Sequence, residues 1–530
     1  MNQYKIIIFI CNWSPHTALQ SLQDNYDEQK NIPEEIKIVR IPCTGRISKA
    51  LLLKAFEMGA DGVALVGCKS GTCRYGSGTV TAEENTKDTR NILELLGLGK
   101  DRMQQATFLP DEGDAFFKFI DNFCNKIRSL GNSPVIPDKN LEPKPLKQKS
   151  IDEIISTHNI YDCQDCGKCT SACPVALIGK PFSPRALASA VIKGNFDSDP
   201  GINDIWSCLT CGLCSERCPS NVSFSEFIRD IRYILKQNGK SGHESHGGFF
   251  HSLMRTMTSK ELTTERWQHL PEDIKIDQAG KTLFFGGCAP FFDILFRKFL
   301  NLDTDKILID SLRLLNFFDI QPVLLNDERC CGHDLLWSGD RDNFLKLARL
   351  NANSINSLNI KEIITSCPEC YRTLAQDYSA YGIELNCKIT HIYDFLEKKI
   401  SQEAVKFKKS DKNLTYQDAC RLNRLDNQRD LPRKLIKRLK VSGFQEMQNH
   451  GNTATCCGNC AWIGCDSYSK ALQVKRLRQA RSTGSDIILT SCPKCQVHLS
   501  CAMEDPFLGD ELKIRLMDLT SAIAGTIYRE

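Results

Sequence analysis

The 530-residue sequence lacks long hydrophobic runs and a recognisable export signal. No apolar stretch approaches the roughly 18 residues that a transmembrane helix needs, so we expect no transmembrane segment. The opening residues, MNQYKIIIFICNW, contain one lysine and an apolar stretch but no small-residue cleavage site. We interpret them as a buried first strand and not as a signal peptide, and we therefore expect a cytoplasmic protein.

An excess of either charge is missing as well. The formal net charge of +4 is small for this length and gives no reason to expect nucleic acid or an anionic membrane as a partner. The sequence has no G-x-G-x-x-G loop that opens a helix after a strand, and no Walker A loop. We therefore expect no flavin or nicotinamide site in the chain itself. The length predicts several domains.

Cysteine is the residue that the sequence has in excess, with 27 copies. In a short secreted chain this number would indicate a disulfide framework, but this chain is long and has no export signal. In a reducing compartment the cysteines remain thiols unless they bind a metal. Their spacing favours metal binding.

Residues 1–132 alternate strand-like and helix-like segments, which predicts a domain with an open parallel sheet. The runs KIIIFI, IKIVRI and GVALVG are typical of strands that are buried on both faces. Ligands in open α/β sheets bind beyond the carboxyl ends of the strands, so we expect the cysteines at these ends to converge. They are Cys11, Cys43, Cys68 and Cys73. Residues 133–150 are rich in proline and lysine and are interpreted as a linker.

Residues 151–240 contain the motif C-x2-C-x2-C-x3-C-P twice and show little strand character. This pattern predicts a helical ferredoxin-type domain with two [4Fe–4S] clusters, in which the fourth cysteine of each run binds the other cluster. The predicted ligand sets are Cys163, Cys166, Cys169 and Cys218 for one cluster, and Cys208, Cys211, Cys214 and Cys173 for the other. A zinc site is the alternative, but zinc favours separated C-x-x-C pairs.

After a predicted helical connector at residues 241–280, the sequence repeats. CCGHDLLW corresponds to CCGNCAWIG, and EIITSCPECYRTL corresponds to DIILTSCPKCQVHL. The two copies, at residues 281–405 and 411–530, predict a duplicated α/β unit. Each copy has five cysteines, more than a cubane cluster or a zinc ion requires. They are Cys288, Cys330, Cys331, Cys367 and Cys370 in copy one, and Cys420, Cys456, Cys457, Cys492 and Cys495 in copy two.

The pattern C…CCG…CPxC in both copies resembles the cysteine-rich CCG domains of heterodisulfide reductase. The resemblance implies that each set of five cysteines holds a noncubane [4Fe–4S] cluster and that a disulfide is cleaved between the two clusters. Both sets are therefore the candidate catalytic ligands. The ferredoxin-type segment resembles the ferredoxin-like subunit of the same enzyme, and its position before the CCG domains resembles the fused subunit of the membrane-linked form. A partner resembling the flavoprotein of heterodisulfide reductase is expected, because flavins connect two-electron with one-electron chemistry.

Residues 1–132 resemble the delta subunit of methyl-viologen-reducing hydrogenase in the segments FICNWS, CTGR and GCKSGTCRYGSG. The resemblance implies a [2Fe–2S] cluster on Cys11, Cys43, Cys68 and Cys73, which receives electrons from a hydrogenase or a formate dehydrogenase. Ser14 stands where the family usually has a fifth cysteine. The alternative is that some of these cysteines are ordinary buried thiols.

Five further cysteines lie outside these motifs. Cys124 and Cys387 are isolated in the sequence, and we interpret them as core thiols. Cys460, Cys465 and Cys501 are near the second CCG motif, where they either tune the site or pack as ordinary thiols.

Histidines and arginines accompany the cysteine motifs. His333 and His450 flank the CC pairs, and they either supply a proton to a leaving thiolate or form ordinary hydrogen bonds. Arg372, Arg421 and Arg424 are close to cluster cysteines in the sequence. They are candidates for steering an anionic substrate or raising the potential of a cluster.

The sequence as a whole predicts a multidomain α/β protein with an α-helical ferredoxin domain, which relays electrons through its clusters to a small disulfide. The coenzyme M–coenzyme B heterodisulfide and other disulfides stay open as substrates. The second hypothesis is an electron-transfer subunit of a larger dehydrogenase or sulfite-reduction complex, without a substrate of its own. The third is a redox sensor or scaffold with zinc in the CCG sites.

Overall fold

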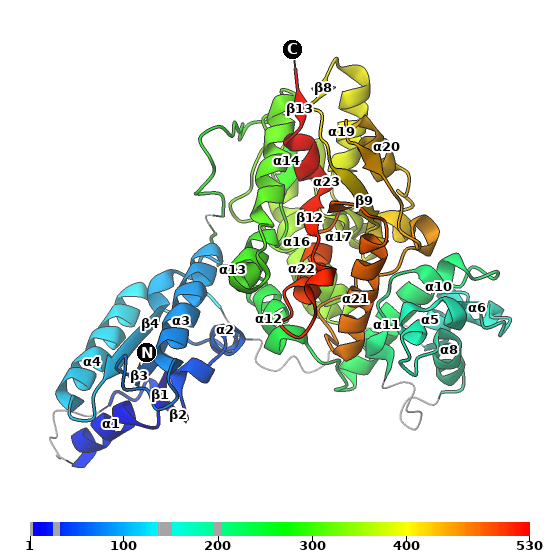
Figure 1. Ribbon diagram of the computed structural model, residues 1–530. Coiled ribbons are helices and arrows are strands. Elements are labelled where there is room, and N and C mark those ends of the chain that lie inside the picture. Colours follow the sequence, from blue (N-terminus) through cyan, green and yellow to red (C-terminus); the bar gives the residue numbers. More distant parts are fainter. Residues whose placement is uncertain are drawn as a thin grey trace. The chain divides into compact units, whose positions relative to one another are not determined.

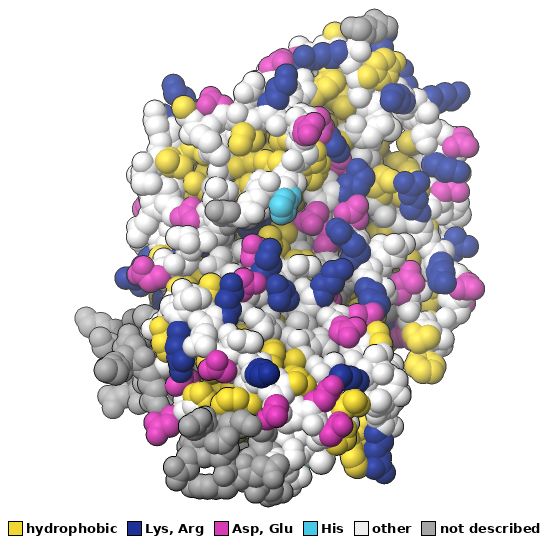
Figure 2. Space-filling model, turned by 90° about the vertical axis from the view of Figure 1, so that its left-hand side faces the viewer, with side chains coloured by type: hydrophobic (Ala, Val, Ile, Leu, Met, Phe, Trp, Pro, Cys, Tyr) yellow, Lys and Arg dark blue, Asp and Glu magenta, His cyan; other side chains and the backbone are white. Residues whose placement is uncertain are grey.

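The computed structural model describes residues 4–24, 32–135, 137, 151–194, 204–264 and 266–529. The chain divides into two compact units, Met1–Glu142 with His246–Arg266, and Pro143–Ser245 with Trp267–Glu530. Most of the predicted linker lies outside the described residues. No helix within the described ranges is both long enough and apolar enough to span a bilayer. On the face drawn in Figure 2, Lys and Arg side chains are interspersed with Asp and Glu, in line with the small net charge.

The first unit is built on a parallel sheet of order β2-β1-β3-β4. The central strand β3 is buried along its whole length, because it has a neighbour on each side and helices above and below. The fourth strand has the polar sequence MQQATF and was not predicted, since an edge strand needs less apolar surface. The strands are β1 (Ile6–Cys11), β2 (Ile36–Ile41), β3 (Gly62–Cys68) and β4 (Met103–Phe108).

Helices cover both faces of this sheet (Figure 1). On one face, α1 (Ser14–Asp24) and α4 (Gly113–Leu130) pack on side chains of β1 and β3, and Phe116 and Ile120 of α4 are fully buried there. The helices α2 (Lys49–Glu57) and α3 (Gly78–Leu95) pack against each other on the sheet. The helix α12 (Phe249–Thr256), from the predicted connector, packs against α2 and so belongs to this unit.

The second unit begins with the helical ferredoxin segment, as the sequence predicts. Its longest helix, α11 (Phe224–Gln237), carries Asp230, whose carboxylate bonds to His158 at 2.9 Å, Arg229 at 3.1 Å and Arg341 at 2.7 Å. Since Arg341 lies in copy one of the repeat, these bonds join the two parts. The other helices are α5 (Ile151–Thr157), α6 (Lys168–Ala172), α7 (Pro174–Leu177), α8 (Pro184–Ile192) and α10 (Leu213–Glu216).

The rest of the second unit contains two α/β domains of matching topology, which confirms the predicted duplication. Copy one has the parallel sheet β5-β6-β7, and copy two has the parallel sheet β10-β9-β11-β12. A single bridge between Leu283 and Val323 takes the place of β10 in copy one. Near the end of the chain, β8 (Lys406–Phe407) pairs with β13 (Ile527–Tyr528) in antiparallel fashion.

The corresponding elements of the two copies follow the same order along the chain (Figure 1). Copy one comprises β5 (Thr282–Phe285), α13 (Ala289–Leu300), α14 (Asp305–Phe317), α15 (His333–Trp337), α16 (Arg341–Asn356), β6 (Glu362–Thr365), α17 (Pro368–Arg372), the π-helix η6 (Thr373–Asp377), α18 (Tyr378–Ala380), β7 (Lys388–His391) and α19 (Ile392–Gln402). Copy two comprises β9 (Asn413–Gln417), the π-helix η7 (Arg421–Leu425), α20 (Leu431–Arg438), β10 (Gly443–Phe444), α21 (Ser467–Arg481), β11 (Ile487–Thr490), α22 (Pro493–Met503), β12 (Arg515–Asp518) and α23 (Leu519–Ala524).

The strands deliver cysteines to the carboxyl edges of both sheets. Cys367 follows β6 and Cys492 follows β11, each two residues after the strand ends. The proline after each of these cysteines is the first residue of a helix. Proline suits this position because the N–H that it lacks would have no hydrogen-bond partner within the helix. Strand, cysteine and proline-initiated helix therefore form one local unit that fixes the thiol at the sheet edge.

Candidate iron–sulfur sites

All 27 cysteines lie in the described residues and are free thiols. None is paired in a disulfide, so their sulfurs are available as metal ligands.

In the first domain, the structure brings the four predicted cysteines together beyond the strand ends. The sulfurs of Cys11 and Cys68 are 3.7 Å apart, and those of Cys43 and Cys73 are 4.0 Å apart. Burial, with a smaller contribution from the neighbouring Cys68, raises the pKa of Cys11 to about 12. A Cβ atom on Gly78 would clash with the sulfurs of Cys43 and Cys73, so this glycine leaves room for them. Four thiols gathered in this way suit one [2Fe–2S] cluster.

In the ferredoxin segment, Cys208, Cys211, Cys214 and Cys173 lie close together. Burial, followed by the negative charges of the other three thiolates, raises the pKa of Cys214 well above its ordinary value. In the other predicted set, burial raises the pKa of Cys169, and the charge of the nearby Cys163 adds a smaller increase. Cys163 and Cys166 are exposed, and Cys218 is partly buried.

In copy one of the repeat, the five cysteines form a continuous chain of sulfur contacts. The order is Cys288, Cys330, Cys331, Cys370 and Cys367. Hydrogen bonds from its two neighbours lower the pKa of the central Cys331 to about 7. The backbone around this chain is held by buried polar side chains, because Gly287 N–H donates to Glu328 at 2.8 Å and Tyr378 O–H donates to the Cys331 carbonyl at 3.2 Å.

Copy two has the same chain of contacts in the same order. It runs through Cys420, Cys456, Cys457, Cys495 and Cys492. Hydrogen bonds from its two neighbours again lower the pKa of the central member, Cys457, to about 6. Each copy thus offers five thiols, each in contact with the next, and the central thiol has a lowered pKa. This donor set is suited to iron and sulfide.

A glycine makes the chain in copy one possible. Gly287 has φ +70°, and a Cβ atom placed on it would lie 2.7 Å from the Cys370 sulfur. Only glycine combines this backbone conformation with this close approach of a sulfur.

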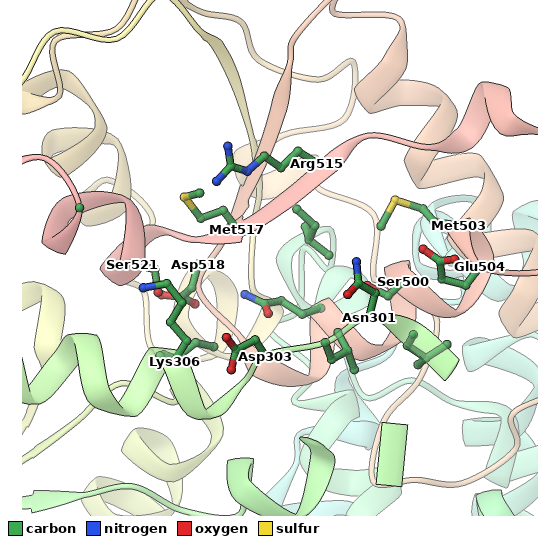
Figure 3. Close-up of a pocket in the computed structure, with 16 residues that line it drawn as sticks. Asn301, Asp303, Lys306, Ser500, Met503, Glu504, Arg515, Met517, Asp518 and Ser521 are labelled. Carbon is green, nitrogen blue, oxygen red and sulfur yellow. The ribbon is translucent and has the colours of Figure 1, made fainter. Parts of the chain in front are cut away.

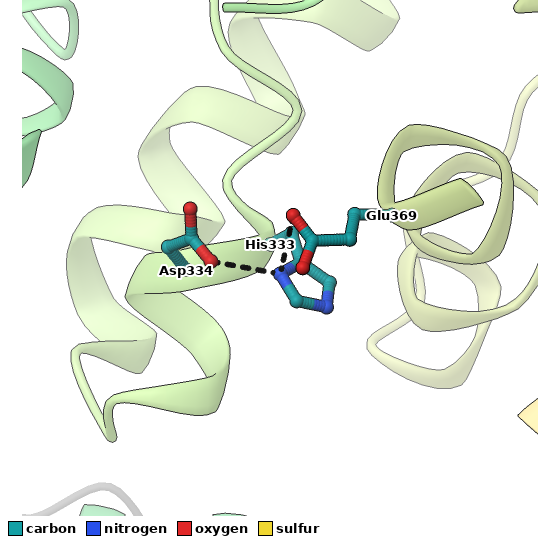
Figure 4. A group of neighbouring side chains, drawn as sticks. All are labelled: His333, Asp334 and Glu369. Carbon is teal, nitrogen blue, oxygen red and sulfur yellow. Dashed lines mark hydrogen bonds and ion pairs between the residues drawn. The ribbon is translucent and has the colours of Figure 1, made fainter. Parts of the chain in front are cut away.

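Buried charges connect the two five-cysteine sites. Lys494, the variable residue of the second CPxC motif, lies 2.5 Å from Asp334 and 2.7 Å from Glu369, the variable residue of the first CPxC motif. Burial lowers the pKa of Lys494, but the two carboxylates outweigh it and raise this pKa well above its ordinary value. His333, Asp334 and Glu369 have the composition of a small metal site (Figure 4), but both carboxylates are already paired with the Lys494 ammonium group.

His333 is buried and both of its ring nitrogens are engaged. Arg421 donates to Nε2 at 2.9 Å, so Nε2 carries no proton, and Nδ1 lies 3.0 Å from Asp334. His333 is therefore held by hydrogen bonds at both ring nitrogens, in agreement with the second of its two predicted interpretations. His450 is exposed and bonds to the Met447 carbonyl.

The three arginines near cluster cysteines are buried and bind protein groups. Arg421 also donates to the Thr210 carbonyl at 2.5 Å and to the Cys460 sulfur at 3.2 Å. Arg424 donates to the Cys211 carbonyl at 2.7 Å, and Arg372 donates to Glu226 at 2.9 Å. These contacts join the two copies to the ferredoxin segment.

The remaining cysteines lie outside the five-thiol chains. Cys124 is fully buried in the core of the first domain, and Cys387 is half-buried, with its pKa raised to about 11 by burial. Cys460 is buried against Thr210. Cys465 is exposed, and Cys501 accepts a hydrogen bond from Lys470 at 3.2 Å.

The sequence matches three family models along its length. Residues 6–131 match the methyl-viologen-reducing hydrogenase, delta subunit; residues 159–222 match the 4Fe-4S dicluster domain; and residues 283–375 and 414–500 match the cysteine-rich CCG domain. The iron–sulfur subunit of the F420-non-reducing hydrogenase vhu of Methanocaldococcus jannaschii is 36% identical over 19% of this chain and 77% of its own length.

The first domain belongs to the hydrogenase delta-subunit family. Behind it, the chain carries a 4Fe-4S dicluster domain and two CCG domains.

Two further relatives cover the dicluster and CCG part. One subunit of the dihydromethanophenazine:CoB–CoM heterodisulfide reductase of Methanosarcina acetivorans is 28% identical over 53% of this chain and 68% of its own length. One subunit of the fumarate reductase (CoM/CoB) of Methanothermobacter marburgensis is 24% identical over 68% of this chain and 60% of its own length. The chain therefore spans well under the whole length of these relatives, and it is homologous to iron–sulfur subunits of oxidoreductases.

Proposed function

We propose that this chain is an iron–sulfur oxidoreductase that reduces a disulfide at its paired CCG domains. The observation that carries the proposal is the pair of five-thiol chains, identical in order, that approach each other between the two copies. The negative charge of Cys367 in copy one contributes to raising the pKa of Cys492 in copy two. Lys494 of copy two also forms ion pairs with Asp334 and Glu369 of copy one. Cleavage of a disulfide takes two electrons, and two neighbouring sites that each supply one electron suit this reaction.

The reaction has the balance R–S–S–R′ plus two electrons and two protons giving R–SH and R′–SH. Bound clusters would supply electrons singly and iron that coordinates sulfur. The chain's own residues hold the ten thiols in place; seven of these cysteines are buried, and Cys288, Cys367 and Cys420 are partly exposed. The Lys494, Asp334, Glu369 and His333 network is held by its own ion pairs and hydrogen bonds, and we assign it the role of fixing the distance between the two sites.

The proposed ligand sets remain those of the sequence prediction. The [2Fe–2S] ligands are Cys11, Cys43, Cys68 and Cys73; the two cubane clusters and the two noncubane clusters take the sets given above. The delta-subunit-like domain is the proposed entry point for electrons from a hydrogenase or formate dehydrogenase. A partner like the flavoprotein of heterodisulfide reductase would carry them from there to the dicluster domain.

The order of the last transfers follows from the contacts. Cys211 of the dicluster domain lies close enough to raise the pKa of Cys456, and Arg424 ties the Cys211 carbonyl to copy two. Copy two is therefore the proposed first acceptor from the cubane clusters. Copy one follows through the contact between Cys492 and Cys367.

One observation favours a second function, an electron-transfer subunit without a substrate of its own. The cavity that touches the copy-one cysteines has a volume of about 20 Å³ and is closed by Phe292, Glu369 and Lys494. This volume holds a water molecule but no disulfide. Under the first proposal, this cavity must widen when a disulfide binds.

The test uses anaerobic full-length protein, reduced methyl viologen as the electron donor, and the coenzyme M–coenzyme B heterodisulfide or cystine as the acceptor. We expect disulfide-dependent oxidation of the viologen, and loss of this activity in Cys456→Ser and Cys457→Ser. Cys387→Ser is the matched control, because it removes a thiol outside both chains. Rapid viologen oxidation by artificial acceptors together with no turnover of any disulfide would establish the second function instead.

A further inference from the structure

A large cavity lies at the junction of the two CCG domains, away from all ten cluster cysteines. Its volume is about 500 Å³, within the range of small-molecule sites. Its walls come from α13 and α14 of copy one and from α22, β12 and α23 of copy two (Figure 3). Cys495 lies in the first turn of α22 and belongs to the cluster site, whereas the next residue, Gln496, lines this cavity.

Three polar side chains that line the cavity are at least nine-tenths buried and have unused hydrogen-bonding groups. They are Gln496 (7% exposed), Ser500 (5%) and Asp518 (2%). One carboxylate oxygen of Asp518 accepts the Thr520 N–H, but the other has no hydrogen-bond partner in the described residues. No hydrogen bond among the described residues involves the side-chain polar groups of Gln496 or Ser500. Buried polar groups normally have partners, so the second oxygen of Asp518 indicates a ligand that supplies one, and Gln496 and Ser500 offer further hydrogen-bonding groups beside it.

In copy one, side chains fill the position that corresponds to this cavity. By the repeat, Tyr371 corresponds to Gln496, since each follows a CPxC motif. His391 corresponds to Asp518, since each ends a strand and caps the next helix with its side chain. Tyr371 and His391 contact each other edge to face, with ring centroids 5.7 Å apart. Copy one fills this position with two rings, whereas copy two has small polar groups around an open space.

The charges around the cavity have both signs. Arg515 lies on one side, and Glu504 lies on another side beside Ser500 and Met503 (Figure 3). Lys306 lies beside Asp303 and Asp518, and its ammonium group is already paired with Asp310 at 2.6 Å. Leu302, Ile307 and Leu516 add apolar wall. We infer that this cavity binds a small zwitterion of the amino-acid class, with its carboxylate at Arg515 and its ammonium group toward Glu504. Gln496, Ser500 and Asp518 form the hydrogen bonds along its length.

The test is equilibrium dialysis of the anaerobic, iron-loaded full chain against a mixture of the protein amino acids, with cysteine omitted because its thiol binds iron. We expect one amino acid, or a group of similar ones, to be enriched to about one molecule per chain. Its N-acetyl and amide derivatives, which lack one charge each, should bind about 10- to 100-fold more weakly, as expected when a charged hydrogen bond is lost. Absence of enrichment of every amino acid overturns the inference.

Variants locate the binding. Gln496→Tyr with Asp518→His transfers the copy-one residues into copy two, and Ser500→Phe fills the cavity without touching a neighbour of a cluster cysteine. Both should abolish binding, and Arg515→Gln at the rim should weaken it about 10- to 100-fold. Lys513→Gln, an exposed change outside the cavity lining, should leave it unchanged. Iron content and circular dichroism report folding of each variant. Retention of full affinity in folded Ser500→Phe and Arg515→Gln proteins overturns the inference.

Discussion

Replacing Lys494 by methionine tests the buried bridge between the two CCG domains. Methionine is similar in length and shape but carries no charge, so the change leaves Asp334 and Glu369 without their cation. The side chains of Lys494 and Asp334 are each 4% exposed and that of Glu369 is 14% exposed, so water provides little compensation. Removing one partner of a buried ion pair costs about 3–5 kcal/mol, and we expect Lys494→Met to lower the free energy of unfolding by this amount.

The assay is anaerobic denaturant unfolding, followed by circular dichroism and cluster absorbance, with the loss of stability taken from the shift in midpoint at constant slope. Lys388→Met in copy one is the control, because Lys388 is 72% exposed and its 3.4 Å pair with Glu362 is a surface pair. Such pairs contribute about 0–1 kcal/mol. Adding Glu369→Gln to Lys494→Met should recover part of the loss, since it removes one stranded charge. A cost for Lys494→Met no larger than that of the control would refute the reasoning.

Three further predictions concern other parts of the chain. Gly287→Ala should lower the iron content by about four atoms per chain, the share of one four-iron cluster, because its Cβ would displace the Cys370 sulfur; unchanged iron would contradict this. Gly78→Ala should remove the [2Fe–2S] signal in electron paramagnetic resonance without changing the four-iron signals, because its Cβ would clash with the Cys43 sulfur; a retained signal would count against the site. Burial raises the pKa of Asp230, but interactions with a histidine and two arginines outweigh it and hold this pKa well below its ordinary value. The ionised carboxylate therefore stabilises the fold above about pH 4, and this stabilisation is lost as the pH falls. Asp230→Asn should therefore reduce stability at pH 7 and lessen the loss of stability between neutral and acid pH, and an identical pH profile for both proteins would disprove this role.

Much of the fold was predictable because the sequence carries strong local signals. The apolar runs that became β1 and β3 are almost wholly buried, and such strands have no polar positions that would disguise them. The run IKIVRI also became a strand, β2, but at the sheet edge, where only Ile41 is buried and Lys37 and Arg40 are exposed, so the expected burial on both faces was wrong for it. The duplication was predictable because both copies keep the same cysteine and proline motifs. The strand β4 was not predicted, because MQQATF has neither an apolar run nor a clear alternation.

Parts of the site depend on tertiary contacts that no local pattern specifies. The pairing of Lys494 with Glu369 follows only when the two copies are placed against each other. A signal was nevertheless present, since CPEC in copy one and CPKC in copy two put opposite charges at equivalent positions of the repeat. The packing of α12 on α2 had no comparable signal, because an apolar helix face does not reveal which domain it covers.

The sharpest test of the five-thiol sites is quantitation of iron, sulfide and zinc in anaerobically purified full-length protein and in Cys457→Ser. We expect about 18 iron atoms per chain, for one [2Fe–2S] and four four-iron clusters, and about four fewer in Cys457→Ser. Cys387→Ser should keep the full complement. A protein with about ten iron atoms and stoichiometric zinc, in which Cys457→Ser loses zinc and no iron, would contradict iron–sulfur clusters in the CCG domains.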